Sequence, residues 1–246
     1  MEQTGIRINK FLSEAGYCSR READRLVESG AVTIDGKQAV PGDKVWEGQS
    51  IFVNGQKVSR EEECILLAFN KPVGVECTTA KNVKDNIIDY INYPKRIYPV
   101  GRLDKDSQGL ILLTNQGDIV NKIMRSGNMH EKEYEVTVHK PYTKEFLCGM
   151  QKGVPLEELN VVTRQCRMEE VDARTFRIVI TQGYNRQIRR MCEYFGYKVV
   201  KLKRIRIMNI TLGSLKKGKY RHVTKEEADK LQELIKDSSN TTVMLK

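Results

Sequence analysis

A short polar and charged run, SREEE at positions 59–63, divides this 246-residue chain into two unequal parts. The run has no apolar side chain that a core could bury, which is typical of a linker. Apolar residues at regular spacing lie on both sides of it, so each part can bury a core of its own. The sequence therefore predicts a small domain at 1–58, a linker at 59–64, a larger domain at 65–236 and a frayed Ser/Asn/Thr-rich tail at 237–246.

The first part has the order helix, helix, small sheet. Apolar residues recur at helical spacing before Gly16. The segment SRRE at 19–22 can form a capping box that opens a second helix, which Gly30 ends. Asp35-Gly36 and Asn54-Gly55 lie beside short apolar runs and favour tight hairpin turns. A compact module of two helices and short hairpins is expected.

The strands of the second part are indicated by two kinds of apolar pattern. Continuous apolar runs at 66–69 and 110–113 are typical of buried strands. Alternating apolar residues at 134–138 and 176–180 predict strands that each line one face of a sheet.

Two helices are expected near the end of this part. The first runs from Arg186 to Phe195, with Asn185 as its N-cap. The second opens with a capping box at 224–227 and packs through Leu231 and Ile235. The second part is therefore a larger domain of mixed strands and helices.

Positive charge is in excess and is clustered. The chain has 42 Lys and Arg residues against 32 Asp and Glu residues, a net charge of +10, which favours polyanions. Arginines gather in the first turns of two expected helices, at 20–21 and 186–190, where the helix dipole disfavours each by ~0.3–1 kcal/mol. A phosphate bound there would be stabilised by the amides and the guanidinium groups together. A third basic region, 198–206, interleaves cations with apolar residues as a folded strand does. Extended contact with nucleic acid phosphates is the resulting interpretation, and solvated surface charge is the alternative.

Other features narrow the class of protein. No apolar stretch approaches the roughly 20 residues of a membrane-spanning helix, and the N-terminus lacks the apolar core of a secretory signal. The six cysteines form no C-x-x-C pair and the three histidines are far apart, so neither a disulfide framework nor a metal site is indicated. We therefore expect a soluble, cytoplasmic protein without a bound metal.

Five segments resemble known families. The segment IRINKFLSEAGYCSRREADRLVESGAVTIDGK, beginning at Ile6, resembles the S4 RNA-binding domain, which presents a positive face of two helices to structured RNA. In the second part, NKPVG, GRLDKDSQGLILLTNQGD, KEY and GYNRQIRRMCEYFGYKVVKLKRIRI occur in the order found in the RsuA-type ribosomal RNA pseudouridine synthases. RSGNMHEKEY and NRQIRRMCEYFGY are most similar to a subgroup that acts on large-subunit ribosomal RNA. The wider family has His where Arg186 stands here.

The resemblance implies an α+β fold, with a small N-terminal S4 (α-L) domain and a pseudouridine synthase catalytic domain on a mixed, mainly antiparallel sheet. It implies a partner among ribosomal RNAs, above all that of the large subunit, with a transfer RNA as a further candidate and no membrane partner. We expect a monomer. The residues expected to contact RNA are Lys10, Arg20, Arg21, Arg25, Arg186, Arg190, Lys201, Lys203 and Arg204.

The reaction of this family defines the expected catalytic residues. Pseudouridine formation breaks the bond from uracil N1 to ribose and rejoins ribose at uracil C5, so no cofactor is expected. It needs a carboxylate positioned by a cation. By its G-R-L-D context Asp104, and not its neighbour Asp106, matches the family's essential aspartate. Arg189 matches the arginine expected to pair with a buried Asp104 and keep it ionised. Whether Asp104 attacks the sugar or removes a ribose proton stays open.

The reaction also needs a dry, flat pocket for a flipped base. Tyr134 matches the tyrosine that stacks on the target base, and Leu202 matches the apolar floor of the pocket. Arg102 matches the arginine that fills the gap left by the flipped nucleotide, a role that suits a planar guanidinium. Without the resemblance, Tyr134 and Leu202 would be interpreted as core residues.

Two other classes of protein share some of these features. An RNA-binding or ribosome assembly factor without catalytic activity would share the S4-like module and the basic charge, but it has no need for a carboxylate in a cationic cleft. A helix-turn-helix DNA-binding regulator would need a dimerising element, and the sequence shows none. The expected catalytic residues favour the enzyme.

Overall fold

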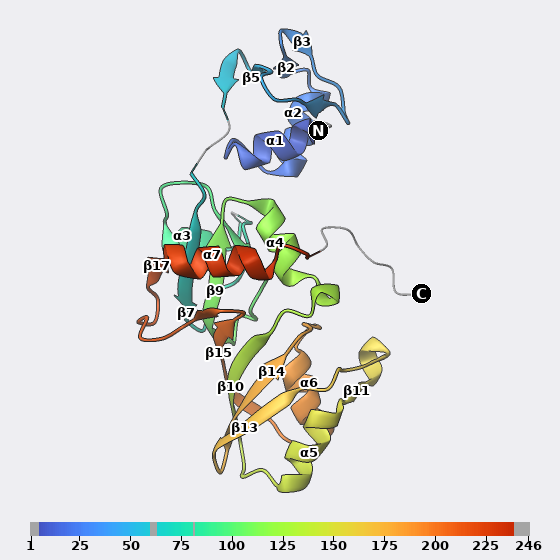
Figure 1. Cartoon of the computed structure of the whole chain (residues 1–246), viewed down its shortest axis with the longest axis vertical. Coiled ribbons are helices and arrows are strands. Elements are labelled where there is room, and N and C mark those ends of the chain that lie inside the picture. The colour runs from blue at the N-terminus through green and yellow to red at the C-terminus, as the bar shows by residue number, and fades with distance from the viewer. Residues whose placement is uncertain (1–4, 60–62, 81, 239–246) are drawn as a thin grey trace. The chain divides into compact units, whose positions relative to one another are not determined.

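The computed structural model of the chain describes residues 5–59, 63–80 and 82–238 (Figure 1). The chain divides into two compact units. The first comprises Met1–Ile65 with Pro94–Ile97 and Asn115–Gly117, and the second comprises the remainder. Half of the expected linker, at 60–62, and most of the expected tail, at 239–246, lie outside the described residues.

The first unit contains two helices and short antiparallel strands. Its core is formed by apolar residues of both helices and of the sheet, among them Leu12, Val27 and Val53. A four-stranded sheet has the order β3-β2-β5-β6, and β1 pairs separately with β4. The elements are β1 (Ile6–Arg7), α1 (Ile8–Glu14), α2 (Arg20–Glu28), β2 (Val32–Ile34), β3 (Lys37–Gln38), β4 (Lys44–Val45), β5 (Ile51–Val53) and β6 (Gln56–Val58).

Local sequence signals determine the ends of these elements. The Ser19 hydroxyl accepts a hydrogen bond from the backbone N–H of Glu22 (3.2 Å) and caps α2, which is one half of the predicted capping box. The Glu22 carboxylate pairs with Arg25. Asp35 and Gly36 both have positive φ, 49° and 80°, in the turn between β2 and β3. This is the backbone of a type I′ hairpin turn, which Asp-Gly adopts readily. The predicted hairpin is confirmed.

The second unit is built on a sheet that has nine strands within the described residues. Its main path is β13-β14-β10-β15-β9-β7-β17, with β16 beside β15 and β8 beside β9. The pair β15–β9 is parallel and the other pairs are antiparallel, which confirms the expected mixed, mainly antiparallel sheet. The strands are β7 (Leu66–Lys71), β8 (Tyr98–Val100), β9 (Gln108–Thr114), β10 (Lys132–Val138), β13 (Arg167–Asp172), β14 (Thr175–Ile180), β15 (Val199–Ile207), β16 (Ile210–Thr211) and β17 (Tyr220–His222).

Helices pack on this sheet through aromatic and aliphatic side chains. Figure 1 shows α7 crossing β7 and β9, where Leu231 and Ile235 pack with Ala68 and Leu112. The ring of Phe146, on α5, lies 5.6 Å from that of Phe176 on β14. The remaining elements are α3 (Ile87–Ile91), α4 (Gly117–Met124), η1 (Ser126–Asn128), α5 (Lys144–Lys152), β11 (Pro155–Leu156), η2 (Glu157–Leu159), β12 (Val161–Val162), α6 (Gln187–Tyr194) and α7 (Lys225–Leu234).

The N-termini of α7 and α6 are capped differently. The capping box of α7 is present as predicted, with both hydrogen bonds between Thr224 and Glu227. The start of α6 was predicted wrongly, because Arg186 and not Asn185 is its N-cap. Arg186 has φ of 52°, in the left-handed region that costs a non-glycine residue roughly 1–2 kcal/mol.

Candidate active site

A pocket of about 390 Å³ opens in the second unit, within the ~300–1,000 Å³ typical of small-molecule sites. Most of its lining comes from the loop before β9, the strand β10, the loop at 183–186 with the first turn of α6, and the strand β15. Met124 at the end of α4 and Ile180 at the end of β14 complete it. Asp104, Tyr134, Leu202 and Arg102 all line this one pocket, although they are far apart in the sequence.

Asp104 lies in a tight turn that neighbouring backbone holds in place. The N–H of Ser107 donates to the carbonyl of Asp104 (3.0 Å), which closes the turn. The N–H of Gly74 donates to the Lys105 carbonyl (2.8 Å), and the N–H of Leu103 donates to Cys77 Sγ (3.4 Å). The side chain of Asp104 is 33 % exposed, so the expected fully buried charge is wrong, and a substrate can reach this carboxylate.

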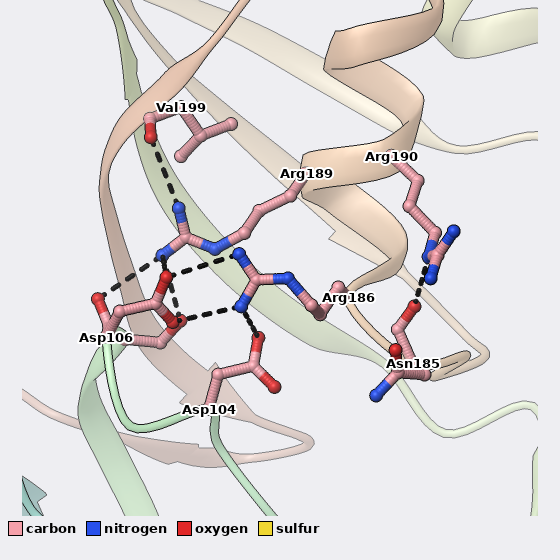
Figure 2. A network of polar contacts seen from close by, with 8 residues as sticks. Asp104, Asp106, Asn185, Arg186, Arg189, Arg190 and Val199 are labelled. Atoms are coloured by element: carbon pink, nitrogen blue, oxygen red, sulfur yellow. Dashed lines mark hydrogen bonds and ion pairs between the residues drawn. The ribbon is translucent and has the colours of Figure 1, made fainter.

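Arg186 bridges the two carboxylates of the loop (Figure 2). One of its nitrogens lies 3.7 Å from Asp104 Oδ2, and two donate to the carboxylate of Asp106, each at 3.3 Å. The hydrogen bonds to Asp106 raise the pKa of Arg186 above its usual value. Arg186 therefore supplies the cation beside Asp104.

Arg189 contacts Asp106 and not Asp104, so the expected Asp104–Arg189 pair is wrong in this structure. Its Nη2 lies 3.2 Å from Asp106 Oδ2 and also donates to the carbonyl of Asp106 (3.2 Å) and to Ser107 Oγ (3.3 Å), while Nη1 donates to the Val199 carbonyl (3.2 Å) (Figure 2). The side chain is buried, and these bonds tie α6 and β15 to the catalytic loop. Arg189 therefore holds the backbone and carboxylate of Asp106 and the hydroxyl of Ser107, and its donors are used there and not at Asp104.

The three other residues expected at the pocket all line it. Tyr134 is buried on β10, on the same face as Val136 and Val138, in agreement with the predicted alternation. Leu202 is buried on β15, opposite Val136 in the sheet. Arg102 is exposed at the pocket. A flat ring entering the pocket therefore meets an aromatic side chain, an aliphatic side chain and a carboxylate.

The cations expected to contact RNA have different environments. Arg20 and Arg21 are exposed in the first turn of α2, and Lys201 is exposed on β15. Arg25 pairs with Glu22 (3.2 Å), Lys10 pairs with Glu14 (3.5 Å), and Lys203 is half-buried. Arg190 forms an ion pair with Glu158 and donates to the carbonyl of Asn185 (3.1 Å).

Arg204 was predicted to be a phosphate contact, and that prediction is wrong. It is 1 % exposed, and its Nε donates to the carbonyl of Leu110 (2.7 Å) while Nη1 donates to the Tyr134 hydroxyl (3.4 Å). Strand alternation explains this placement, because Arg204 shares the inward face of β15 with Leu202. The composition of the segment indicated charge, but only the face of the strand tells where the charge points.

Sequence reasoning also missed three residues of the site. Asp106, set aside as a neighbour of Asp104, accepts hydrogen bonds from both arginines. Lys71 is fully buried, and its ammonium donates to the carbonyls of Pro72 (2.9 Å) and Val75 (2.6 Å), which shapes the turn that braces the catalytic loop. Burial lowers the pKa of Lys71. Lys132 also lines the pocket. Its position two residues before Tyr134 on one strand could have predicted this, because alternate residues of a strand share a face.

Within the described part of the chain, no three His, Cys, Asp or Glu side chains are grouped so that they could hold a metal ion. Nor is any described helix long and apolar enough to cross a bilayer.

Comparison with known proteins identifies the class. The family model for RNA pseudouridylate synthase matches residues 65–194, and the S4 domain model matches residues 6–51. The chain therefore belongs to the RNA pseudouridylate synthase family and carries an S4 domain. It is an RNA pseudouridine synthase, an isomerase, and the catalytic interpretation is confirmed over that of an RNA-binding factor without activity.

Individual relatives indicate the branch of the family to which the chain belongs. The chain is 53% identical over 242 residues to the dual-specificity RNA pseudouridine synthase RluF of Salmonella typhi, covering 98% of this chain and 83% of that protein. It is 37% identical to the ribosomal large subunit pseudouridine synthase B of Bacillus subtilis, covering 95% and 98% of the two chains. A solved pseudouridylate synthase superposes with a TM-score of 0.68 at 29% identity, covering 92% and 99%. The predicted RsuA-type membership, close to RluF, is confirmed.

Proposed function

We propose that this enzyme converts specific uridines of large-subunit ribosomal RNA to pseudouridine, and that a transfer RNA is its second substrate. The similarity to one relative named for the ribosomal large subunit, and to another named as dual-specific, supports this choice. The observation that carries the proposal is the pocket in which Asp104 faces the same space as Tyr134 and Leu202.

The pocket residues have distinct proposed roles. The target uridine flips out of the RNA, its base stacks on Tyr134 above Leu202, and Arg102 occupies the gap left behind. The Asp104 carboxylate then acts on the ribose as nucleophile or base, and the C1′–N1 bond breaks. Arg186 lies 3.7 Å from Asp104 and orients its carboxylate, and Arg189 acts indirectly, by holding the loop through Asp106. Arg189 is therefore proposed as a positioning residue.

Docking of the RNA is assigned to the S4 domain and to the basic surface beside the pocket. Arg20 and Arg21 extend from the N-terminus of α2, where the backbone amides and the guanidinium groups together favour a phosphate. Lys201 and Lys203 on β15 extend the proposed contact in the catalytic unit. One chain supplies all the residues that line the pocket, and we propose that the enzyme acts as a monomer in the cytoplasm, where ribosomal RNA is found.

The proposed substrate is tested by mapping pseudouridines in ribosomal and transfer RNA from a strain that lacks this gene. We expect one or more large-subunit sites to revert to uridine, to be restored by the wild-type gene and not by Asp104→Asn. Loss confined to small-subunit RNA, or to no ribosomal RNA, would exclude the proposed substrate.

The proposed docking surface is tested by salt dependence. Arg20→Ala combined with Arg21→Ala is expected to weaken RNA binding and to reduce the slope of log affinity against log salt by about 1 per lost phosphate contact. Lys37→Ala combined with Lys57→Ala removes the same charge from exposed positions on the sheet of the same unit, and serves as the control. Equal slopes for the two double variants would exclude α2 as a docking surface.

A further inference from the structure

Two cations are buried side by side against the target-base pocket. Lys132 on β10 is 4 % exposed and Arg204 on β15 is 1 % exposed, and both line the pocket. Arg204 lies opposite Tyr134 in the sheet, with its guanidinium carbon 5.9 Å from the centre of the Tyr134 ring. Lys132 shares the buried face of β10 with Tyr134. The two cations and the stacking aromatic ring therefore form one wall.

Neither cation has a carboxylate partner among the residues that the structure describes. Arg206, the next cation on β15, differs from them, because it pairs with Glu133 (2.7 Å) and Glu131 (3.1 Å). The Lys132 ammonium has three donors, and its hydrogen bond is a long one of 3.4 Å to the His130 carbonyl. The Arg204 Nη2 is buried and has no hydrogen-bond partner. Buried cations without a carboxylate partner destabilise a fold, so a retained pair indicates that something else supplies the negative charge.

Asp104 does not neutralise the pair, since its ionic partner is Arg186. The charged neighbour that acts on Lys132 is Arg204, and repulsion from it adds to the effect of burial, which lowers the pKa of Lys132 to about 8. A perturbed cation in a cleft is a feature of functional sites. The missing charge must therefore arrive with the ligand.

The reaction itself produces that charge. When the C1′–N1 bond breaks, its electron pair remains on uracil, where O2 and O4 share the negative charge. Ribose C1′ then bonds to C5 as its bond to Asp104 breaks, or, on the base route, as the ribose proton taken by Asp104 is returned. The C5 proton is released and N1 takes up a proton, so that atoms and charge balance. Both routes open to Asp104 pass through this anionic ring.

We propose that Lys132 and Arg204 bind the carbonyl oxygens of the flipped uracil and stabilise the negative charge that develops on the ring as the C1′–N1 bond breaks. This role rests on the proposed reaction in the pocket. Fixed cations aimed at developing charge in a water-poor site lower the barrier more than they strengthen ground-state binding. Lys132 is the better residue to test, because Arg204 also joins β15 to β9 through the Leu110 carbonyl.

The test compares Lys132→Met with wild type in single-turnover reactions at saturating RNA. The rate is expected to fall about 10²-fold while RNA affinity is unchanged, and Lys132→Arg is expected to recover part of the rate. Lys152→Met removes the same charge from an exposed position on α5 and is the control. Should Lys132→Met fail to fold, Lys132→Gln replaces it.

A second substrate separates this role from a structural one. An RNA with 5-fluorouridine at the target position releases a less basic ring, so cleavage of its C1′–N1 bond should depend less on Lys132. The defect of Lys132→Met is therefore expected to be smaller with this RNA. Equal defects with both RNAs, or a wild-type rate with uridine, would overturn the proposal.

The RNA used is the one that the wild-type enzyme modifies in the mapping experiment. If wild type and Lys132→Met are equally active, the proposed role of Lys132 is refuted and the proposed function is not. A wild type that modifies no RNA refutes both this role and the proposed function.

Discussion

Replacing Asp104 by asparagine is expected to lower the rate of pseudouridine formation by about 10⁴-fold or more, as removal of a catalytic carboxylate or nucleophile does elsewhere. The amide has nearly the same shape as the carboxylate but is neither a nucleophile nor a base. Asp104 is partly exposed, with Arg186 as its ionic partner, so the fold depends little on its charge. RNA affinity and melting temperature should therefore stay close to wild type. The rate is measured by single-turnover conversion of the target uridine.

Asp106→Asn is the matched control for this experiment, because the same change is made two residues away. Asp106 accepts hydrogen bonds from Arg186 and Arg189 and holds the loop, but it does not line the pocket. We expect Asp106→Asn to lower stability and to keep measurable activity. An active Asp104→Asn together with an inactive but stable Asp106→Asn would show that Asp106, and not Asp104, is the catalytic carboxylate.

Replacing Gly109 by alanine is expected to lower the free energy of unfolding by more than about 3 kcal/mol, the range of severe backbone conflicts, or to prevent folding. Gly109 has φ of 103°, and an added Cβ would lie 2.3 Å from the Arg204 carbonyl oxygen and 2.7 Å from the Arg204 nitrogen. These atoms belong to the parallel pairing of β9 with β15, so no side chain can move aside to make room. The change would displace Arg204 from the wall of the pocket.

The effect is measured by urea unfolding of Gly109→Ala and Gly127→Ala. Gly127 has an ordinary φ and no neighbouring atom within 4 Å of an added Cβ, so its variant should stay within about 0.5 kcal/mol of wild type. Similar unfolding free energies for the two variants would show that β9 and β15 do not approach so closely.

Features that depend on neighbouring residues were predictable from the sequence. The Ser19 cap, the Asp35-Gly36 turn and the Thr224 capping box each form from residues within four positions of one another. Strand alternation correctly placed Tyr134 with Val136 on a buried face. The pocket residues Asp104 and Leu202 came from the family resemblance, and the structure brings them to one cavity.

The two units, the kinds of elements and their caps follow from propensities and side-chain periods, which act over short distances, whereas the chemical character of the pocket followed from the family resemblance. The carboxylate that each arginine contacts depends on the tertiary structure. Asp104 and Asp106 are two residues apart, and Arg186 and Arg189 are three residues apart, so sequence spacing does not assign one carboxylate to each arginine. The pairing depends on how α6 approaches the loop. The hydrogen-bond partners of Arg204 depend in the same way on the pairing of β15 with β9 and β10 across distant parts of the chain. Such long-range register sets which donor faces which acceptor, and no local pattern encodes it.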